Sequence, residues 1–236
     1  MPLSGHIHSG MVQSTSRSPG SAACPVPPDA RASGRIGKSS ALAAPDLTLS
    51  AQLRARTANL HRDTERQLGL PHVIRTFDDY KGWLVRFLGL YRPLEQSLAS
   101  FTDWSSDTIL LPSPSHSARL AADLHALGIE AAGIAYAPAS LLPPLPTFGH
   151  AVGALYVLEG SSLGGVVILR QLEARLGPPI RVATRFFGGR ADGTGAAWKR
   201  FKADVDSLGR REPDLTDNAV AGAESVFRAL PAWFAL

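Results

Sequence analysis

The sequence predicts an all-α protein with a single folded domain, and three observations lead to that class. After residue 47, apolar residues recur at spacings of three and four in several separate stretches, which is the period of an amphipathic helix. No stretch has the alternation of a half-buried strand, and no repeat of about 20–50 residues is present. Short Gly-, Pro- or Ser-rich runs separate the stretches, so we expect a bundle of about six to eight helices.

The composition is that of an ordinary globular protein. Of the 236 residues, 44% are hydrophobic and 19% are charged, and the net charge of +4 is dispersed along the chain. This dispersal argues against a nucleic-acid-binding surface, and no run of about eighteen apolar residues indicates a membrane span. The single cysteine, Cys24, excludes an internal disulfide and a cysteine zinc site. We therefore expect a cytoplasmic protein with neither a membrane nor a nucleic-acid partner.

Residues 1–47 differ from the rest of the chain. Ser, Gly, Pro and Ala dominate, and only Asp29 and Asp46 are acidic. Such a segment buries too little apolar surface to offset its ordering entropy, so we expect a disordered N-terminal extension. The folded helical domain is expected over residues 48–236.

The first helix is expected to start at Ser50 and to end at Gly69. On one side of it, Arg54, His61 and Glu65 follow one another as cation, imidazole and carboxylate. One interpretation is a solvated His–Glu pair at i,i+4, worth a few tenths of a kcal/mol. The other is a metal-ligating imidazole oriented by Glu65, with Arg54 near an anionic group of the ligand. The buried face of this first helix is expected to consist of Leu53, Thr57, Leu60, Thr64 and Leu68.

Residues 76–79, Thr-Phe-Asp-Asp, form a capping box that opens the next helix. Pro93 lies inside that helix and is expected to kink it, and Gly89, four residues earlier, is expected to ease the clash. A shorter helix follows, preceded by His116, which we expect to be structural or solvated.

The stretch 150–165 is the most unusual part of the chain, because four glycines lie in what the apolar spacing marks as one long helix. Each glycine weakens a helix interior by about 1 kcal/mol relative to alanine. Gly153, Gly160 and Gly164 share one face, and Gly165 follows them. A flat or bulky ligand against this bare backbone is one interpretation. A helix-packing seam, in which small residues let two backbones approach, is the other.

Residues 160–164 also match the G-x-S-x-G motif of α/β-hydrolases, with Ser162 as the nucleophile. That fold requires a strand before the serine and a histidine late in the chain. No strand pattern is present, and no histidine follows His150. Both observations argue against an esterase.

Two further amphipathic helices complete the domain. The first contains Trp198 and Phe201, with Lys199 and Lys202 beside its apolar stripe, and the last begins near Asp217.

The chain resembles the haem oxygenases in two segments, Leu53-x-x-x-Thr57-x-x-x-His61-x-x-x-Glu65 and Tyr156-Val-Leu-Glu-Gly-Ser-Ser-Leu-Gly-Gly165. It is most similar to the bacterial branch associated with bacteriophytochromes, and the similarity extends across about residues 50–236. The resemblance implies a haem-oxygenase-like bundle in which haem b lies between a proximal helix and a kinked distal helix. It also implies oxidative opening of the macrocycle with O₂ and external electrons, giving biliverdin, CO and Fe²⁺.

The resemblance implies roles for the residues of the first segment and of the later helix. His61 corresponds to the axial iron ligand, and Glu65 corresponds to the acceptor that orients its ring. Arg54 corresponds to a propionate-binding base, and Lys199 and Lys202 lie where the family supplies further propionate partners.

In the second segment, the resemblance implies that Gly160, Gly164 and Gly165 bend the distal helix and direct the reaction to one meso edge of the haem. Ser161 stands where many members have an aspartate that orders distal water. A haem-binding carrier or sensor without turnover is therefore the alternative function. The partners implied are a ferredoxin- or flavoprotein-type electron donor and a bacteriophytochrome that accepts biliverdin.

Overall fold

The computed structural model describes residues 47–105, 115–189 and 193–236, and α-helices make up most of these ranges, with no strand among them. The all-α prediction is confirmed. Apart from Leu47, the expected N-terminal extension lies outside the described residues. The helices are α1 (Leu49–Leu68), α2 (Phe77–Ala99), α3 (His116–Ala126), α4 (Phe148–Leu176), α5 (Thr194–Arg211) and α6 (Thr216–Phe234).

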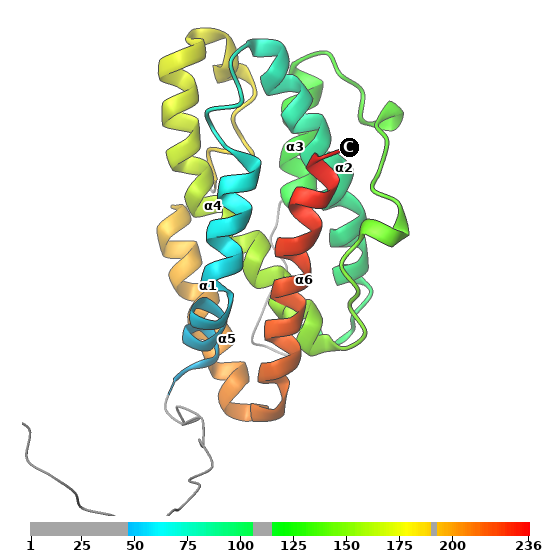
Figure 1. Cartoon of the computed structure of the whole chain (residues 1–236), viewed down its shortest axis with the longest axis vertical. Helices are drawn as coiled ribbons and strands as arrows, with labels where there is room; N and C mark the ends of the chain where they lie inside the picture. The colour runs from blue at the N-terminus through cyan, green and yellow to red at the C-terminus, as the bar shows by residue number, and fades with distance from the viewer. Residues whose placement is uncertain (1–46, 106–114, 190–192) are drawn as a thin grey trace, which may run out of the picture. The chain divides into compact units, whose positions relative to one another are not determined.

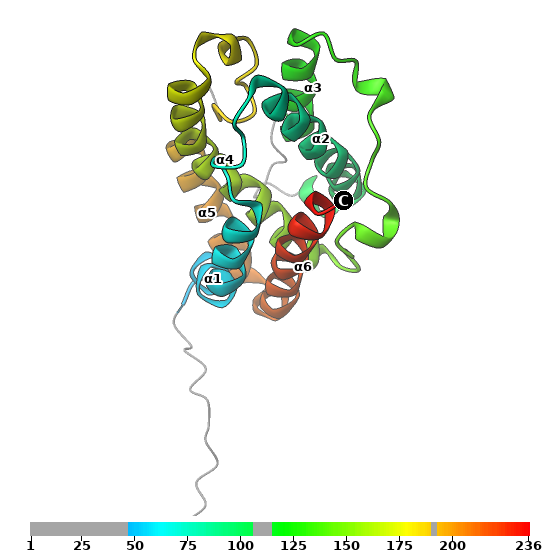
Figure 2. The same ribbon diagram turned by 45° about the horizontal axis from the view of Figure 1, so that its top comes forward.

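The long helices pack in pairs. Among the described helices, α4 and α6 have the most extensive contact, α1 packs against α6 and α5, and α2 packs against α3. Figures 1 and 2 both show α1 beside α6, and α4 passes behind α6 in the view of Figure 1. Although α1 and α4 both pack against α5 and α6, they make little direct contact with each other. The spacing between α1 and α4 is therefore set by α5 and α6.

The contact between α4 and α6 is a glycine seam. A Cβ atom added to Gly153 would lie 1.7 Å from the carbonyl oxygen of Ala219, and one added to Gly222 would lie 2.1 Å from the carbonyl oxygen of His150. The two backbones thus approach closer than any side chain permits. The helix-seam interpretation is correct at Gly153, and the expectation that this glycine faces a ligand is wrong.

Several predicted helix ends are confirmed. The Thr76 hydroxyl accepts a hydrogen bond from the Asp79 N–H, and the Asp79 carboxylate accepts one from the Thr76 N–H, which completes the capping box. Thr147 caps α4, which ends at Gly177. Because each capping contact joins residues within one helical turn, these helix ends are predictable from the sequence alone.

The start of α1 differs from the prediction. The helix begins at Leu49, after Thr48, and Ser50 already lies in its first turn. The Ser50 N–H donates to the Asp206 carboxylate of α5 at 2.7 Å. The carboxylate of Asp206, from another helix, therefore accepts the hydrogen bond of a first-turn N–H group, for which the sequence alone predicts a capping side chain nearby in the chain.

Pro93 lies inside α2 without ending it. A proline has no N–H, so the carbonyl of Gly89 loses its helical donor. That carbonyl instead accepts a hydrogen bond from the Ala137 N–H at 2.9 Å. A Cβ atom on Gly89 would lie 2.7 Å from the carbonyl oxygen of Ala135 and 2.8 Å from the Trp233 ring. The glycine is therefore explained by the close approach of the segment around residue 136.

By length and composition alone, α4 is apolar enough to cross a membrane. Within its most apolar 18-residue window, however, 61% of the residues are buried inside the structure, and every residue from Ala151 to Glu159 is buried. A core helix passes the same test, so α4 is weak evidence for a membrane span.

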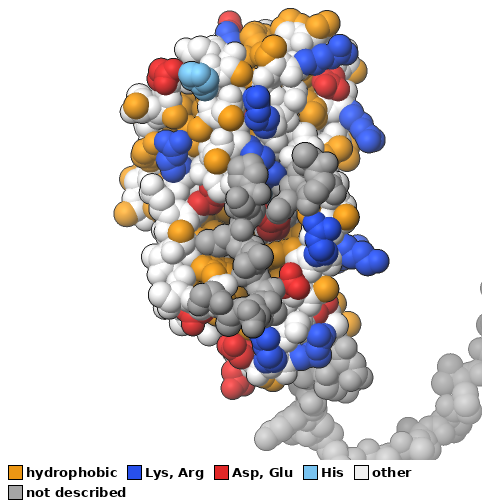
Figure 3. Space-filling view, turned by 180° about the vertical axis from the view of Figure 1, so that it is seen from behind, with side chains coloured by type: hydrophobic (Ala, Val, Ile, Leu, Met, Phe, Trp, Pro, Cys, Tyr) orange, Lys and Arg blue, Asp and Glu red, His pale blue; other side chains and the backbone are white. Residues whose placement is uncertain are grey.

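Charged side chains are dispersed on the face shown in Figure 3, where Lys and Arg lie among apolar and neutral groups without forming one patch. Some cations pair with acidic neighbours on their own helix, as Lys81 does with Asp78 and Arg228 with Glu224. The visible face therefore has no concentrated positive surface.

Candidate functional site

The predicted axial ligand, His61, lies on the exposed side of α1. Its side chain is 57% exposed, and its Nε2 atom lies 3.3 Å from the Glu65 carboxylate. The ring packs at 5.3 Å from the ring of Phe227 on α6. The Thr64 hydroxyl donates to the Phe227 carbonyl at 2.9 Å and joins the two helices here. Because over half of the side chain is exposed, the ring can turn to donate through one nitrogen and offer the other to a ligand.

The donor groups around His61 fit an iron atom that already has other ligands. No group of three or more His, Cys, Asp or Glu side chains placed to hold a metal ion occurs in the part of the chain that the structure describes. A bare zinc ion needs three or four protein ligands, whereas haem iron needs only an axial one from the protein. One accessible imidazole with an adjacent carboxylate therefore suits haem better than a bare ion.

The three glycines of the predicted distal segment have different surroundings. A Cβ atom on Gly164 would meet no atom within 4 Å, and one on Gly160 would lie 3.5 Å from the Trp198 ring. One on Gly165 would lie 3.1 Å from the carbonyl oxygen of Phe187. Gly164 thus faces open space, Gly160 faces an aromatic ring, and Gly165 packs against backbone.

The surface of α4 beside Gly164 is apolar and open. Leu163 is 37% exposed and Val167 is 54% exposed. An exposed apolar stretch next to a bare backbone is a surface that a flat hydrophobic ligand would cover. This part of α4 therefore fits a haem face.

Two predicted cations approach one aromatic pair. The Lys202 Nζ atom lies 5.7 Å from the centroid of the Trp198 ring, and that ring lies 5.1 Å from the Tyr156 ring. Burial raises the pKa of Tyr156, and the nearby charge of Arg54 opposes this shift. Lys202 from α5 thus lies over the Trp198 ring and the charge of Arg54 from α1 acts on Tyr156, whereas Lys199 is exposed on α5. Arginine and lysine side chains of this kind suit the carboxylates of haem propionates.

The Ser161 hydroxyl donates one hydrogen bond and accepts another. Its hydroxyl donates to the Leu158 carbonyl at 2.7 Å, and the Tyr91 hydroxyl of α2 lies 3.3 Å from its Oγ atom as a donor. Burial raises the pKa of Tyr91 to about 12, against the opposing hydrogen bond to Ser161. At neutral pH, Tyr91 is therefore a protonated donor to Ser161.

A buried polar cluster behind α4 was not predicted. His116 is only 1% exposed, and its Nδ1 atom lies 3.2 Å from the Glu95 carboxylate. Its Nε2 atom lies 3.4 Å from the Ser162 hydroxyl and 3.8 Å from the Glu159 carboxylate. The expectation that His116 has a structural role is correct, and the alternative that it is exposed to solvent is wrong. The available signal was its spacing of four from Leu120, which puts it on the inward stripe of α3.

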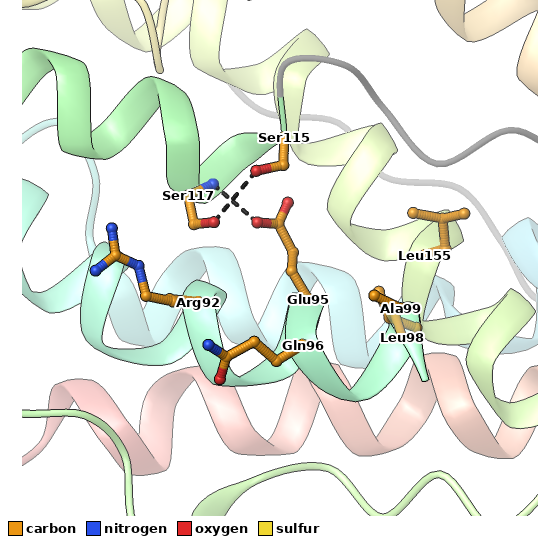
Figure 4. A pocket seen from close by; sticks show the side chains of 8 residues that line it. All are labelled: Arg92, Glu95, Gln96, Leu98, Ala99, Ser115, Ser117 and Leu155. Carbon is orange, nitrogen blue, oxygen red and sulfur yellow. Dashed lines mark hydrogen bonds between the residues drawn. The ribbon is translucent and has the colours of Figure 1, made fainter. Parts of the chain in front are cut away.

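The Glu95 carboxylate also caps α3. Its two oxygens accept from the N–H groups of His116 at 2.7 Å and Ser117 at 2.9 Å, and Figure 4 shows the contact with Ser117. Burial raises the pKa of Glu95, but the hydrogen bonds from His116 and Ser117 outweigh it and lower the value to about 2. A pocket of about 370 Å³ adjoins this carboxylate, and none of the predicted haem residues lines it. Its lining consists of Arg92, Glu95, Gln96, Leu98, Ala99, Ser115, Ser117 and Leu155.

Ser162, His116 and Glu95 reproduce the hydrogen-bond order of a serine-hydrolase triad. The absence of a histidine after His150 is therefore not a sufficient argument against an esterase. An esterase is still excluded because its serine must lie on an exposed strand-to-helix turn, whereas Ser162 is 5% exposed inside the continuous helix α4. Helical N–H groups there are engaged along the backbone and offer no oxyanion hole.

Comparison with known proteins identifies the family of this chain. The Heme oxygenase of Xanthomonas campestris pv. campestris (strain 8004) is 38% identical over 89 residues, which is 38% of this chain and 52% of that protein. The match thus spans about half the length of the relative. The NO- and CO-bound heme oxygenase structure from Neisseria meningitidis superposes with a TM-score of 0.61 at 22% identity, covering 80% of this chain and 94% of that one. The family described as Heme oxygenase matches residues 47–235, so the chain belongs to the haem oxygenase family.

Proposed function

We propose that this protein is a haem oxygenase that binds haem b between α1 and α4. It opens the macrocycle with O₂ and external electrons to give biliverdin, CO and Fe²⁺. The observation that carries the proposal is the His61–Glu65 pair, an exposed imidazole beside a carboxylate acceptor on α1. The family match over most of the chain and the name of the Xanthomonas relative support the same activity.

In this proposal, His61 binds the iron and Glu65 orients the imidazole. A carboxylate that accepts the N–H of one ring nitrogen keeps the other nitrogen unprotonated and ready to coordinate. The contact with Phe227 limits how far the ring turns. Arg54 and Lys202 bind the propionates, with Lys199 as a further cation on the same helix.

The distal side is formed by α4. The open backbone of Gly164 leaves room for the haem, and exposed Leu163 and Val167 supply apolar contact, while Gly160 adjoins the Trp198 ring and Gly165 packs closely against the Phe187 backbone. When bound, haem supplies the oxygen activation and is itself the group that is oxidised. The protein's contribution is to orient the macrocycle, restrict water and deliver protons.

Proton delivery is assigned to Tyr91 and Ser161. Tyr91 stays protonated at neutral pH and donates to Ser161, whose hydroxyl can pass a proton through water. The bond from Ser161 to the Leu158 carbonyl competes with this delivery. That competition favours the second candidate function, a haem-binding carrier or sensor that does not turn over.

The proposed reaction consumes electrons, so an external ferredoxin- or flavoprotein-type donor belongs to the proposal. Membership of the bacteriophytochrome-associated branch, with a bacteriophytochrome as the biliverdin acceptor, is proposed from the sequence motifs.

Hemin titration followed by an electron donor in air tests the function. A histidine-ligated Soret band, followed by verdohaem and biliverdin bands, is expected from a haem oxygenase. A stable Soret band that persists through reduction in air would instead identify a carrier or sensor. Failure to bind hemin would refute both.

A further inference from the structure

The His116 cluster lies behind the glycine-containing part of α4. Ser162 and Glu159 are the α4 residues that His116 approaches. At about 100° per residue, they lie on roughly the opposite side of the helix from Gly164. The cluster therefore contacts the side of α4 opposite to the open backbone of Gly164.

The cluster is charged as well as buried. The low pKa of Glu95 leaves its carboxylate ionised at neutral pH. The other titratable or charged groups facing this region are Tyr91 from α2, Arg119 from α3 and Glu159 from α4. Ionised groups are retained in a protein interior when their hydrogen bonds hold them in one geometry. Such contacts fix the rotation and register of a helix in a way that apolar contacts do not.

A second contact ties α3 to the surroundings of the glycines. The fully buried Asp123 accepts hydrogen bonds from the N–H groups of Arg185 at 2.9 Å and Phe186 at 2.8 Å. The next residue, Phe187, is the one whose backbone covers Gly165. With His116 near its start and Asp123 near its end, α3 joins both α4 and the segment that packs against α4.

We propose that His116 is a positioning residue for the reaction. Held by Glu95, it fixes Ser162 and Glu159 and thereby sets the rotation of the Gly160–Gly165 segment toward the haem. The consequence for catalysis rests on the proposed function, whereas the effect on α4 is a property of the haem-free protein.

Four variants separate positioning from general stability. Ser162→Ala removes only the α4 end of the contact and leaves the Glu95–His116 bond in place. His116→Asn keeps a polar group near Nδ1 but does not reach Ser162, whereas His116→Gln places an amide near Nε2. The control is His125→Asn on the same helix, where His125 forms a 3.3 Å pair with Glu130 and both side chains are 78% exposed.

Hydrogen exchange of the haem-free protein is the first measurement. Ser162→Ala and His116→Asn are expected to speed exchange in residues 159–166 by about tenfold relative to the rest of α4. His116→Gln should restore most of the protection, and His125→Asn should match the wild type. Uniformly faster exchange in all core helices, or unchanged exchange in Ser162→Ala, would refute the proposal. If His116→Asn does not fold, Ser162→Ala alone decides.

The second measurement is the pH midpoint of the acid–alkaline spectral transition of the ferric haem complex. Ser162→Ala and His116→Asn are expected to move it by about half a pH unit, because the distal surroundings rotate, while His116→Gln and His125→Asn leave it in place. Variants with the wild-type midpoint would overturn the link to the haem. A wild-type protein that binds no hemin would refute the proposed function, and the exchange result would still decide the positioning role.

Discussion

Alanine substitutions at three glycines of α4 are expected to change the stability of the haem-free protein in opposite directions. At Gly164 the added methyl group meets no atom within 4 Å, and at Gly160 it lies 3.5 Å from the Trp198 ring, an ordinary contact. Gly164→Ala and Gly160→Ala should therefore each stabilise the protein by up to ~1 kcal/mol through helix propensity. At Gly153 the methyl group would lie 1.7 Å from the Ala219 carbonyl oxygen. Since backbone cannot rotate aside, α4 and α6 must separate, which costs ~1–3 kcal/mol or more.

Urea denaturation of the haem-free variants measures these differences. With a slope of about 2 kcal/mol per molar urea, a gain of ~1 kcal/mol raises the midpoint by about half a molar unit. Gly153→Ala should lower the midpoint by at least that amount. The sign of the shift, rather than its size, separates the two kinds of glycine.

The same variants are expected to rank differently in haem degradation. Gly164→Ala places a methyl group on the surface proposed to contact haem, and Gly160→Ala places one against the Trp198 ring beside that surface, so biliverdin formation should fall although the protein is more stable. A Gly164→Ala protein that is destabilised, yet forms biliverdin at the wild-type rate, would show that the seam extends along the whole helix. The haem-facing assignment of Gly164 would then be refuted.

The remaining predictions concern single groups. His61→Ala should abolish the histidine-ligated Soret band without loss of helicity, and an unchanged hemin titration would refute the axial assignment. Lys202→Ala should weaken hemin binding by about tenfold, as expected for the loss of one propionate ion pair, whereas Lys199→Ala should have less effect. Equal losses of affinity in hemin titrations of the two variants would contradict the assignment of Lys202 as the main propionate partner on α5. Burial raises the pKa of Glu95, but hydrogen bonds from His116 and Ser117 lower it from 4.5 to about 2, so its ionised form stabilises the fold above about pH 4.5 by roughly 3 kcal/mol. That stability is lost as the pH falls toward 2, and urea midpoints from about pH 6 to 3 should fall less steeply for Glu95→Gln than for the wild type. Deleting residues 1–47 should leave the thermal midpoint and hemin affinity nearly unchanged, and a large drop in either would show that this segment docks.

The features predictable from the sequence are those set by neighbours in the chain. The Thr76–Asp79 capping box and the end of α4 at Gly177 depend on contacts within one helical turn. The His61–Glu65 pair depends on a spacing of four, and the structure contains it. Its ligand role remains a prediction, because a solvated pair and a haem ligand share this contact.

The surroundings of each glycine were not predictable. Gly153 and Gly160 are seven residues apart on one face of α4, yet α6 covers one and Trp198 of α5 faces the other. Which helix crosses α4 at which turn depends on packing between segments that are far apart in the chain, 66 residues for Gly153 and Ala219 and 38 for Gly160 and Trp198. The same limit applies to His116, whose partners come from α2 and α4.

The two sides of α4 have opposite requirements. If haem lies against Gly164, no protein side chain covers the helix there, the Trp198 ring lies beside Gly160 only, and the glycines weaken the helix themselves. Order must then come from the back, where Ser162 and Glu159 meet His116. Apolar side chains on this buried face of α4 would avoid the cost of burying charge. They would also let the helix rotate, because dispersion contacts are not directional. The hydrogen bond between Ser162 and a fixed imidazole, with the Glu159 carboxylate 3.8 Å from the ring, removes that freedom, which accounts for a buried charged cluster behind the glycine-containing part of the longest helix among the described residues.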